Sequence, residues 1–269
     1  MSTLADRLRR GQQRAFSTSC STLPSVDAAT GSPSSLASAA VAALRMCGFV
    51  VLRSALSMPH VESLAAAYAD LPELVTADLR DGRREQLLPF AAPFNDDALL
   101  HGELWTSVAA EYLGATALDL DAVTVVLAPE GSAAQELHRD VTVGPTAVLS
   151  VHIPLVSLPS GGGTLSLQPA SHLTEGRDCD AGAPPAPFEV PISPGSMILC
   201  TPPTPVHGSP AVGAARTLGP APPKHPPQRL RRTSSGAGGA SLSLTAHGVD
   251  EHSAPPARTA RPYREPEPA

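Results

Sequence analysis

Short apolar segments separated by glycine and proline fill the middle of the chain, and they restrict the possible folds more than any other feature. Five of them follow one another after about residue 118: AVTVVLA (122–128), TAVLSVHIPL (146–155), TLSLQP (164–169), PFEVPI (187–192) and SMILC (196–200). Each has the length of a strand and is bounded by turn residues. This spacing predicts a β-sandwich or a barrel.

Helical patterns precede these strands, and each has a start or stop signal. They lie at about 36–47, which is Ala-rich and ends at Gly48; at 57–70, which Ser57 and Pro59 open; and at 97–113, which Gly114 ends. Between the first two, GFVVLRSAL is predicted to be a strand. Helices first and strands second indicate an α+β arrangement.

Both ends of the chain differ from this middle part. Residues 1–35 contain Arg7, Arg9, Arg10 and Arg14 before a Ser/Thr-rich run, which is typical of an organellar transit peptide or of a disordered leader. Residues 220–269 are dense in Pro, Ser and charge, without sustained apolar periodicity, and are predicted to be disordered. The expected domain is therefore 36–219.

Composition narrows the functional class. The 269 residues are 42% hydrophobic, enough for a core, and carry a net charge of -6, which argues against a nucleic-acid binder. No apolar run approaches the roughly 20 residues of a membrane span. We expect a soluble intracellular protein, cytoplasmic or, if the leader is a transit peptide, organellar. The oligomeric state is not indicated.

The four cysteines are scattered, at positions 20, 47, 179 and 200, without a C-x-x-C pair. This pattern favours small buried or exposed thiols in a reducing compartment over a disulfide framework or a zinc site.

His138-Arg139-Asp140 is the first motif that could carry chemistry. It follows the strand at 122–128 and a Pro-Glu-Gly-Ser turn, and it precedes the strand at 146–155. In a strand, residues two apart point to the same side, so both side chains can reach one metal ion. H-x-D alone is a common chance match, and a surface His–Asp pair is the alternative.

His207 is the second candidate ligand, because it follows the apolar strand at 196–200 and a short Pro-rich stretch. Two histidines and one carboxylate leave coordination positions open, as in non-haem iron(II) oxygenases. Nine residues later, Arg216 offers a planar bidentate cation for a cosubstrate carboxylate, or is a solvated arginine. His152 alternates with apolar neighbours, which predicts a place facing the same interior. The other histidines fall in helical or turn contexts or in the tail.

Three stretches resemble the phytanoyl-CoA dioxygenase family: QELHRD (135–140), LSVHIPLVSLPSGGGTLSLQPASHL (149–173) and SPGSMILCTPPTPVHGSPAVGAAR (193–216). The resemblance runs from about residue 36 to 218. It implies a mainly β fold, a double-stranded β-helix (jelly-roll) with supporting N-terminal helices. It also implies iron(II) held by His138, Asp140 and His207, with Arg216 on the distal carboxylate of 2-oxoglutarate. Because Asp140 is a carboxylate, the sequence is similar to the hydroxylases and not to the related halogenases.

The sequence departs from the family after Arg216, where further strands are expected and the Pro-rich tail begins instead. We therefore expect the final strand or strands to be missing or replaced. Three functions stay open. One is a dioxygenase that uses iron(II), 2-oxoglutarate and O2 to hydroxylate a small organic substrate, with release of succinate and CO2. Another is a catalytically inactive jelly-roll binding module or truncated product. The third is a cupin-type isomerase or thiol dioxygenase.

Overall fold

A computed structural model provides the structure of the chain. The residues it describes are Cys20 and the ranges 23–72, 77–78, 83–129, 131–135, 137–138, 148–161, 163–174, 186–201, 206–208 and 239–249. The helices are α2 (Pro33–Cys47), α3 (Met58–Asp70), α4 (Asp97–Leu100), α5 (Glu103–Leu113) and the 3-10 helix η1 (Ser171–Thr174). The strands are β1 (Ser25–Asp27), β2 (Phe49–Arg53), β3 (Ala77–Asp78), β4 (Arg84–Leu87), β5 (Ala117–Ala128), β6 (Val148–Pro154), β7 (Leu165–Leu167), β8 (Phe188–Val190), β9 (Met197–Cys200), β10 (Val206–Gly208) and β11 (Gly239–Val249).

The strands form a large and a small sheet. Within the described ranges the large sheet has the order β1-β2-β9-β6-β11-β5-β4-β3 and the small sheet the order β10-β7-β8. All neighbours are antiparallel except β1 and β2. The sheets meet where the rings of Phe49 and Phe188 pack at 5.8 Å between centroids. This two-sheet arrangement is the predicted jelly-roll.

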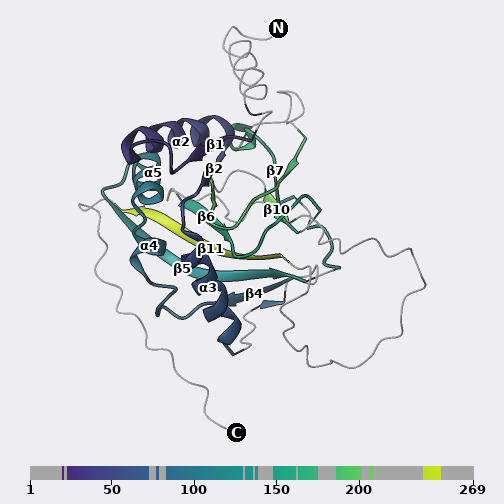
Figure 1. The fold of residues 1–269 in the computed structure, drawn as a ribbon. Helices are drawn as coiled ribbons and strands as arrows, with labels where there is room; N and C mark the ends of the chain where they lie inside the picture. Colours follow the sequence, from purple (N-terminus) through teal and green to yellow (C-terminus); the bar gives the residue numbers. More distant parts are fainter. Residues whose placement is uncertain are drawn as a thin grey trace.

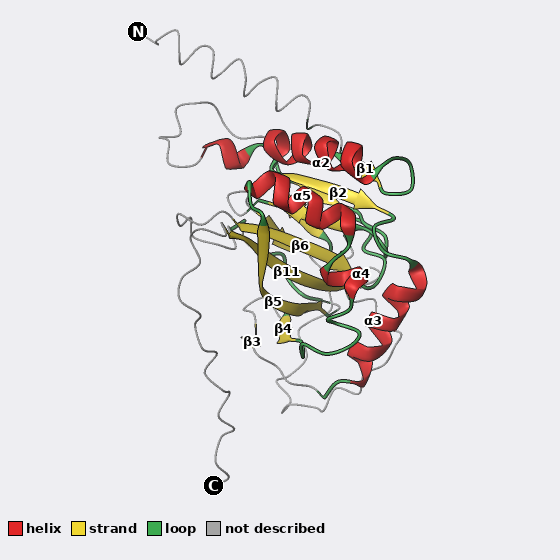
Figure 2. Ribbon diagram, turned by 90° about the vertical axis from the view of Figure 1, so that its left-hand side faces the viewer, coloured by secondary structure: helices red, strands yellow, loops and turns green. Residues whose placement is uncertain are grey.

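One face of the large sheet packs against helices. In Figures 1 and 2, α2 and α5 lie side by side over the strands. Leu44 of α2, Val108 of α5 and Val151 of β6 belong to the same buried cluster, and all are at most 1% exposed. Alternation along β2 and β9 sends one set of side chains into this helix-side core and the other set toward the small sheet.

A second core lies on the other face of the large sheet. It joins Ile198 of β9 and Val51 of β2 to Leu167 and Val190 of the small sheet. The two cores together therefore bury both faces of β2 and β9.

The five predicted strand segments are confirmed as β5 to β9, and the predicted helix before Gly48 is confirmed as α2. Gly48 takes the left-handed conformation (φ 84°) and its amide donates to the Leu44 carbonyl (2.9 Å), a glycine cap. The single helix expected over 97–113 is wrong, because the chain forms α4 and α5. Gly102 separates them, and a side chain there would meet the Ala98 carbonyl at 2.9 Å.

The predicted disordered tail is wrong for Gly239–Val249. These residues form β11, which pairs with β5 on one side and β6 on the other (Figure 1). The alternation Ser-Leu-Ser-Leu gives the strand two apolar side chains, and both Leu242 (0% exposed) and Leu244 (1%) enter the helix-side core. The strand expected to be missing is thus replaced from within the tail. The remainder of 220–269 lies outside the described residues.

The predicted disordered leader is wrong at its end. Ser25–Asp27 form β1, because a free edge of β2 accepts a parallel partner, and the Val51 amide donates to the Pro24 carbonyl (2.9 Å). The expectation of unpaired thiols is also wrong for two cysteines. Cys20 and Cys47 form a disulfide, because folding brings them together across 27 residues. Residues 1–19, and with them the transit-peptide arginines, lie outside the described part. None of the helices that the structure describes could span a membrane.

Candidate metal centre

The loop that leads to His138 begins where β5 ends. Ser132 closes a turn onto Pro129, whose carbonyl accepts bonds from the Ser132 amide (3.0 Å) and hydroxyl (2.7 Å). Gly131 supplies the positive φ (86°) that this turn requires. The predicted turn is therefore confirmed, and it redirects the chain from the large sheet toward His138.

A buried arginine holds this loop from the side. Arg83 precedes β4, which pairs with β5, and it is 2% exposed. Its Nη1 donates to the Ala133 carbonyl at 2.6 Å, five residues before His138. Sequence reasoning missed Arg83, because DGRREQ is typical of a solvated charged run. Only the pairing of β4 with β5 brings it inside.

His138 and His207 lie on different parts of the jelly-roll. His138 takes part in a one-residue β-bridge and its side chain is exposed. The backbone of His207 lies in β10, directly opposite Ser166 of β7 in the small sheet. Asp140 and Arg216 fall outside the described residues, so their roles stay predictions. In the part of the chain that is described, no three His, Cys, Asp or Glu side chains gather as a metal site.

His152 lies on the inner face of the large sheet. Its neighbours Val151 and Ile153 belong to the helix-side core, whereas Ile198, opposite it in β9, belongs to the core between the sheets. Directly paired residues of antiparallel strands share a face. His152 is half-buried, with its Nε2 atom out of contact with solvent. The predicted inward placement of this histidine agrees with that register.

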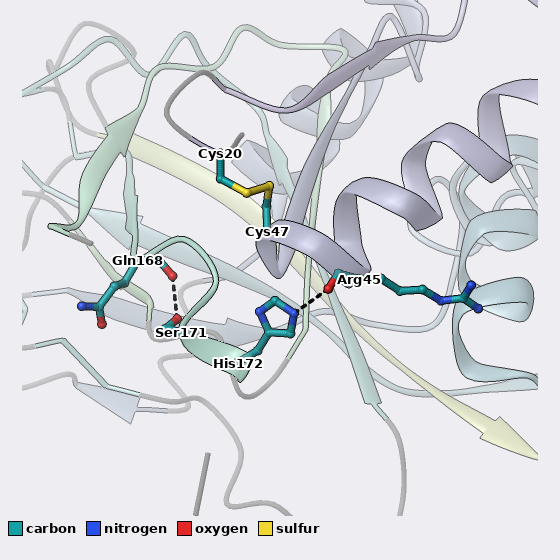
Figure 3. Close-up of a disulfide and its surroundings, with 6 residues drawn as sticks. All are labelled: Cys20, Arg45, Cys47, Gln168, Ser171 and His172. Atoms are coloured by element: carbon teal, nitrogen blue, oxygen red, sulfur yellow. Dashed lines mark hydrogen bonds between the residues drawn. A yellow bond between two sulfur atoms is a disulfide. The ribbon is translucent and has the colours of Figure 1, made fainter. Parts of the chain in front are cut away.

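The turn after β7 ties the small sheet to the helix layer. The Nε2 atom of His172 lies 3.0 Å from the Arg45 carbonyl, and Ser171 donates to the Gln168 carbonyl at 2.5 Å (Figure 3). Burial lowers the pKa of His172, and the hydrogen bond to Arg45 opposes that shift. The imidazole is therefore neutral near pH 7 and donates its Nε2 proton to the carbonyl.

Tyr112 of α5 borders the same region. Burial raises the pKa of its phenol, while a hydrogen bond with the Thr201 side chain and the charge of Arg45 act in the opposite direction. The hydroxyl consequently stays protonated and can link α5 to the end of β9.

No protein-family model matches the chain. No curated protein matches it either. Solved structures do match. They include the non-haem α-ketoglutarate-dependent carbocyclase SnoK from nogalamycin biosynthesis (TM-score 0.59, 16% identity, 81% of this chain and 86% of that chain). The epimerase SnoN in complex with Fe3+, α-ketoglutarate and nogalamycin RO matches at TM-score 0.59 and 19% identity, over 88% of this chain and 96% of that chain.

HygX from Streptomyces hygroscopicus, with nickel and 2-oxoglutarate bound, matches at TM-score 0.56 and 14% identity, over 78% of this chain and 86% of that chain. At such identities the likeness establishes the fold. The chain is a jelly-roll protein, with the fold that it shares with SnoK, SnoN and HygX. The fold expected from the family resemblance is confirmed.

Proposed function

We propose that the chain is an iron(II)- and 2-oxoglutarate-dependent dioxygenase that hydroxylates a small organic substrate. The observation that carries the proposal is the shared jelly-roll, which extends over 78% to 88% of the chain in SnoK, SnoN and HygX. Metal and 2-oxoglutarate are bound in the SnoN and HygX structures. In this chain, the H-x-D motif and the distal histidine would supply donors for such a metal.

The donor set fits iron(II). His138 and His207 would each give an imidazole nitrogen and Asp140 a carboxylate oxygen, which leaves open positions for a cosubstrate and dioxygen. Arg216 would pair with the distal carboxylate of 2-oxoglutarate through a bidentate guanidinium. When bound, the iron supplies the oxidising power for dioxygen chemistry, with 2-oxoglutarate consumed to succinate and CO2.

The chain's own residues position these groups. Arg83 fixes the loop before His138 through the Ala133 carbonyl, and the register of β10 with β7 fixes the backbone of His207. The apolar core between the sheets, which contains Val51 and Ile198, excludes water from one side of the interior. His152 is placed on the same face and can donate a hydrogen bond to a polar group of a bound small molecule.

Hydroxylation is the expected outcome, because Asp140 keeps the carboxylate that distinguishes the hydroxylases in the family resemblance. The inactive-module alternative was based on a missing closing strand. Since β11 fills a place between β5 and β6, that reason no longer applies.

Anaerobic titration with iron(II) and 2-oxoglutarate tests the proposal. We expect a weak visible charge-transfer band, and succinate on admission of O2. His138→Ala and Asp140→Ala should abolish both, whereas His101→Ala and Asp70→Ala, which change exposed residues, should leave the band unchanged. Absence of the band with the intact chain, or its survival in His138→Ala, would contradict the assignment. Detection of a hydroxylated product then separates hydroxylation from other oxidative outcomes.

A further inference from the structure

The disulfide joins the N-terminal segment to the end of a helix. Cys47 is the last residue of α2, and its Cα lies 5.7 Å from that of Cys20 (Figure 3). Both cysteines are 0% exposed and belong to the core between the sheets, against which Leu23 also packs. The bond thus holds Cys20 in the same core that includes residues of the small sheet.

The end of α2 also contacts the turn after β7 and the end of β9. The last carbonyls of a helix have no partner within it. Three carbonyls here accept hydrogen bonds from distant segments: that of Arg45 from the ring of His172 (3.0 Å), that of Cys47 from the Ala170 amide (2.9 Å) and that of Gly48 from the Thr201 amide (2.9 Å).

These distant segments are the supports of β10. Ala170 and His172 belong to the turn that follows β7, the strand with which β10 pairs. Thr201 follows the last residue of β9, and β10 begins five residues later at Val206. A movement of the end of α2 therefore acts on the turn after the partner strand of β10 and on the end of β9.

We infer that the Cys20–Cys47 disulfide is a redox-responsive clamp that positions β10, and with it His207. While the bond is intact, the end of α2 stays fixed and its carbonyls hold the turn after β7 and the end of β9. Reduction frees Cys20 and loosens that end. The effect on metal binding rests on the proposed function, whereas the effect on the backbone does not.

The chemistry of release is a thiol–disulfide exchange with a dithiol. The S–S bond breaks, Cys20 and Cys47 each gain a proton and become thiols, and the dithiol leaves as its own disulfide. Because both cysteines are fully buried, the clamp opens only when Cys20 moves away from the core. Folded protein should therefore react more slowly than protein in denaturant.

Hydrogen exchange tests the clamp independently of any metal. The intact chain is compared with chain refolded in excess dithiol, and the bond is verified by mass as tryptic peptide 15–45 linked to 46–53. We expect the Ala170 and Thr201 amides to exchange about tenfold faster after reduction. The Leu88 amide, which donates to Val123 in the large sheet, should be unchanged. Equal acceleration at all three, or at none, would overturn the clamp.

Two variants make the test specific. Cys20→Ser should show the fast exchange with or without dithiol. Cys200→Ala removes the buried cysteine of the same core that takes no part in the disulfide, and it should keep the dithiol response. A dithiol response in Cys20→Ser, or its loss in Cys200→Ala, would overturn the assignment to this disulfide.

Metal affinity then tests the link to His207. Anaerobic iron(II) titration should give about tenfold weaker binding in the reduced chain, as when the supports of metal ligands are removed. Equal affinity in both forms would overturn the positioning of His207. An oxidised chain that binds no iron would instead contradict the proposed function, and the exchange result would still decide the clamp.

Discussion

At the scale of single residues, His172 is the most informative titratable group in the described structure. Its ring is packed at the end of α2, and its hydrogen bond to Arg45 requires a proton on one nitrogen. The other nitrogen, Nδ1, is buried without a partner there. A second proton would therefore place a charge where nothing compensates it, which is why burial lowers the pKa below its usual 6.5.

This burial predicts that acid weakens the fold. Between the lowered folded pKa and 6.5, the unfolded chain binds a proton at His172 that the folded chain does not. The contribution is fully present above pH 6.5 and falls as the pH decreases. Urea midpoints at about pH 7.5 and about pH 5.5 should differ less in His172→Gln than in the intact chain. His101→Gln, at an exposed site, should behave like the intact chain; an equal decline in all three would contradict this role.

Arg83 gives a second prediction at this scale. Its replacement by alanine leaves the Ala133 carbonyl without its donor and should cost about 2 kcal/mol in the free energy of unfolding. Iron(II) affinity should fall about tenfold, because the loop before His138 loses its support. Arg53→Ala, at an exposed position of β2, is the control and should change neither. A destabilised Arg83→Ala with intact affinity would show that the loop does not position His138.

At the scale of elements, β11 decides whether the large sheet is continuous. It contributes two leucines to the helix-side core and pairs along both edges. Leu244→Ala should therefore cost about 3 kcal/mol, the usual loss for a fully buried leucine. Val156→Ala, at a site 38% exposed, should cost about 0.5 kcal/mol. Urea denaturation compares the two, and equal small losses would place residue 244 outside the core.

The strands and helices were predictable where local pattern and burial agree. The segments that became β5 to β9 are apolar and bounded by turns, and α2 ends at a glycine that the helix requires. The strand β11 was missed because two leucines amid serines and a Pro-rich context carry little apolar signal. This segment becomes a strand because β5 and β6 offer it backbone hydrogen-bond partners on both sides and the core buries its two leucines. The Cys20–Cys47 pair was missed for a similar reason, since 27 residues of separation do not indicate a contact.

The candidate site was predictable in part. H-x-D followed by a distal histidine is a chemical pattern, and the sequence places His138 between two strands and His207 after one, whereas the strand β10 that contains His207 has no such signal. The role of these residues as metal ligands stays a prediction. Arg83 has no such signal, because its burial depends on β4 pairing with β5. Inward placement of His152 follows from alternation, which sequence does contain.

At the scale of the whole molecule, the large sheet should be inseparable from the end of the sequence. A chain that stops at residue 238 lacks β11 and leaves β5 and β6 without a shared neighbour. We expect it to lose cooperative urea unfolding, whereas a chain that stops at residue 250 should retain it. Near-UV circular dichroism and urea denaturation compare the two. Cooperative unfolding of the shorter chain would show that the sheet closes without β11.

The position of β11 also affects how the large sheet can fold while the chain is being synthesised. Its partner strand β5 lies more than a hundred residues earlier in the chain, so the central pairing of the sheet joins parts synthesised far apart in time. As the polypeptide leaves the ribosome, β5 and β6 emerge long before the strand that unites them. Strand pairing over such a long sequence separation forms slowly. Until it forms, the unpaired edges of β5 and β6 can associate with other chains. Yield should therefore depend on chaperone supply during synthesis.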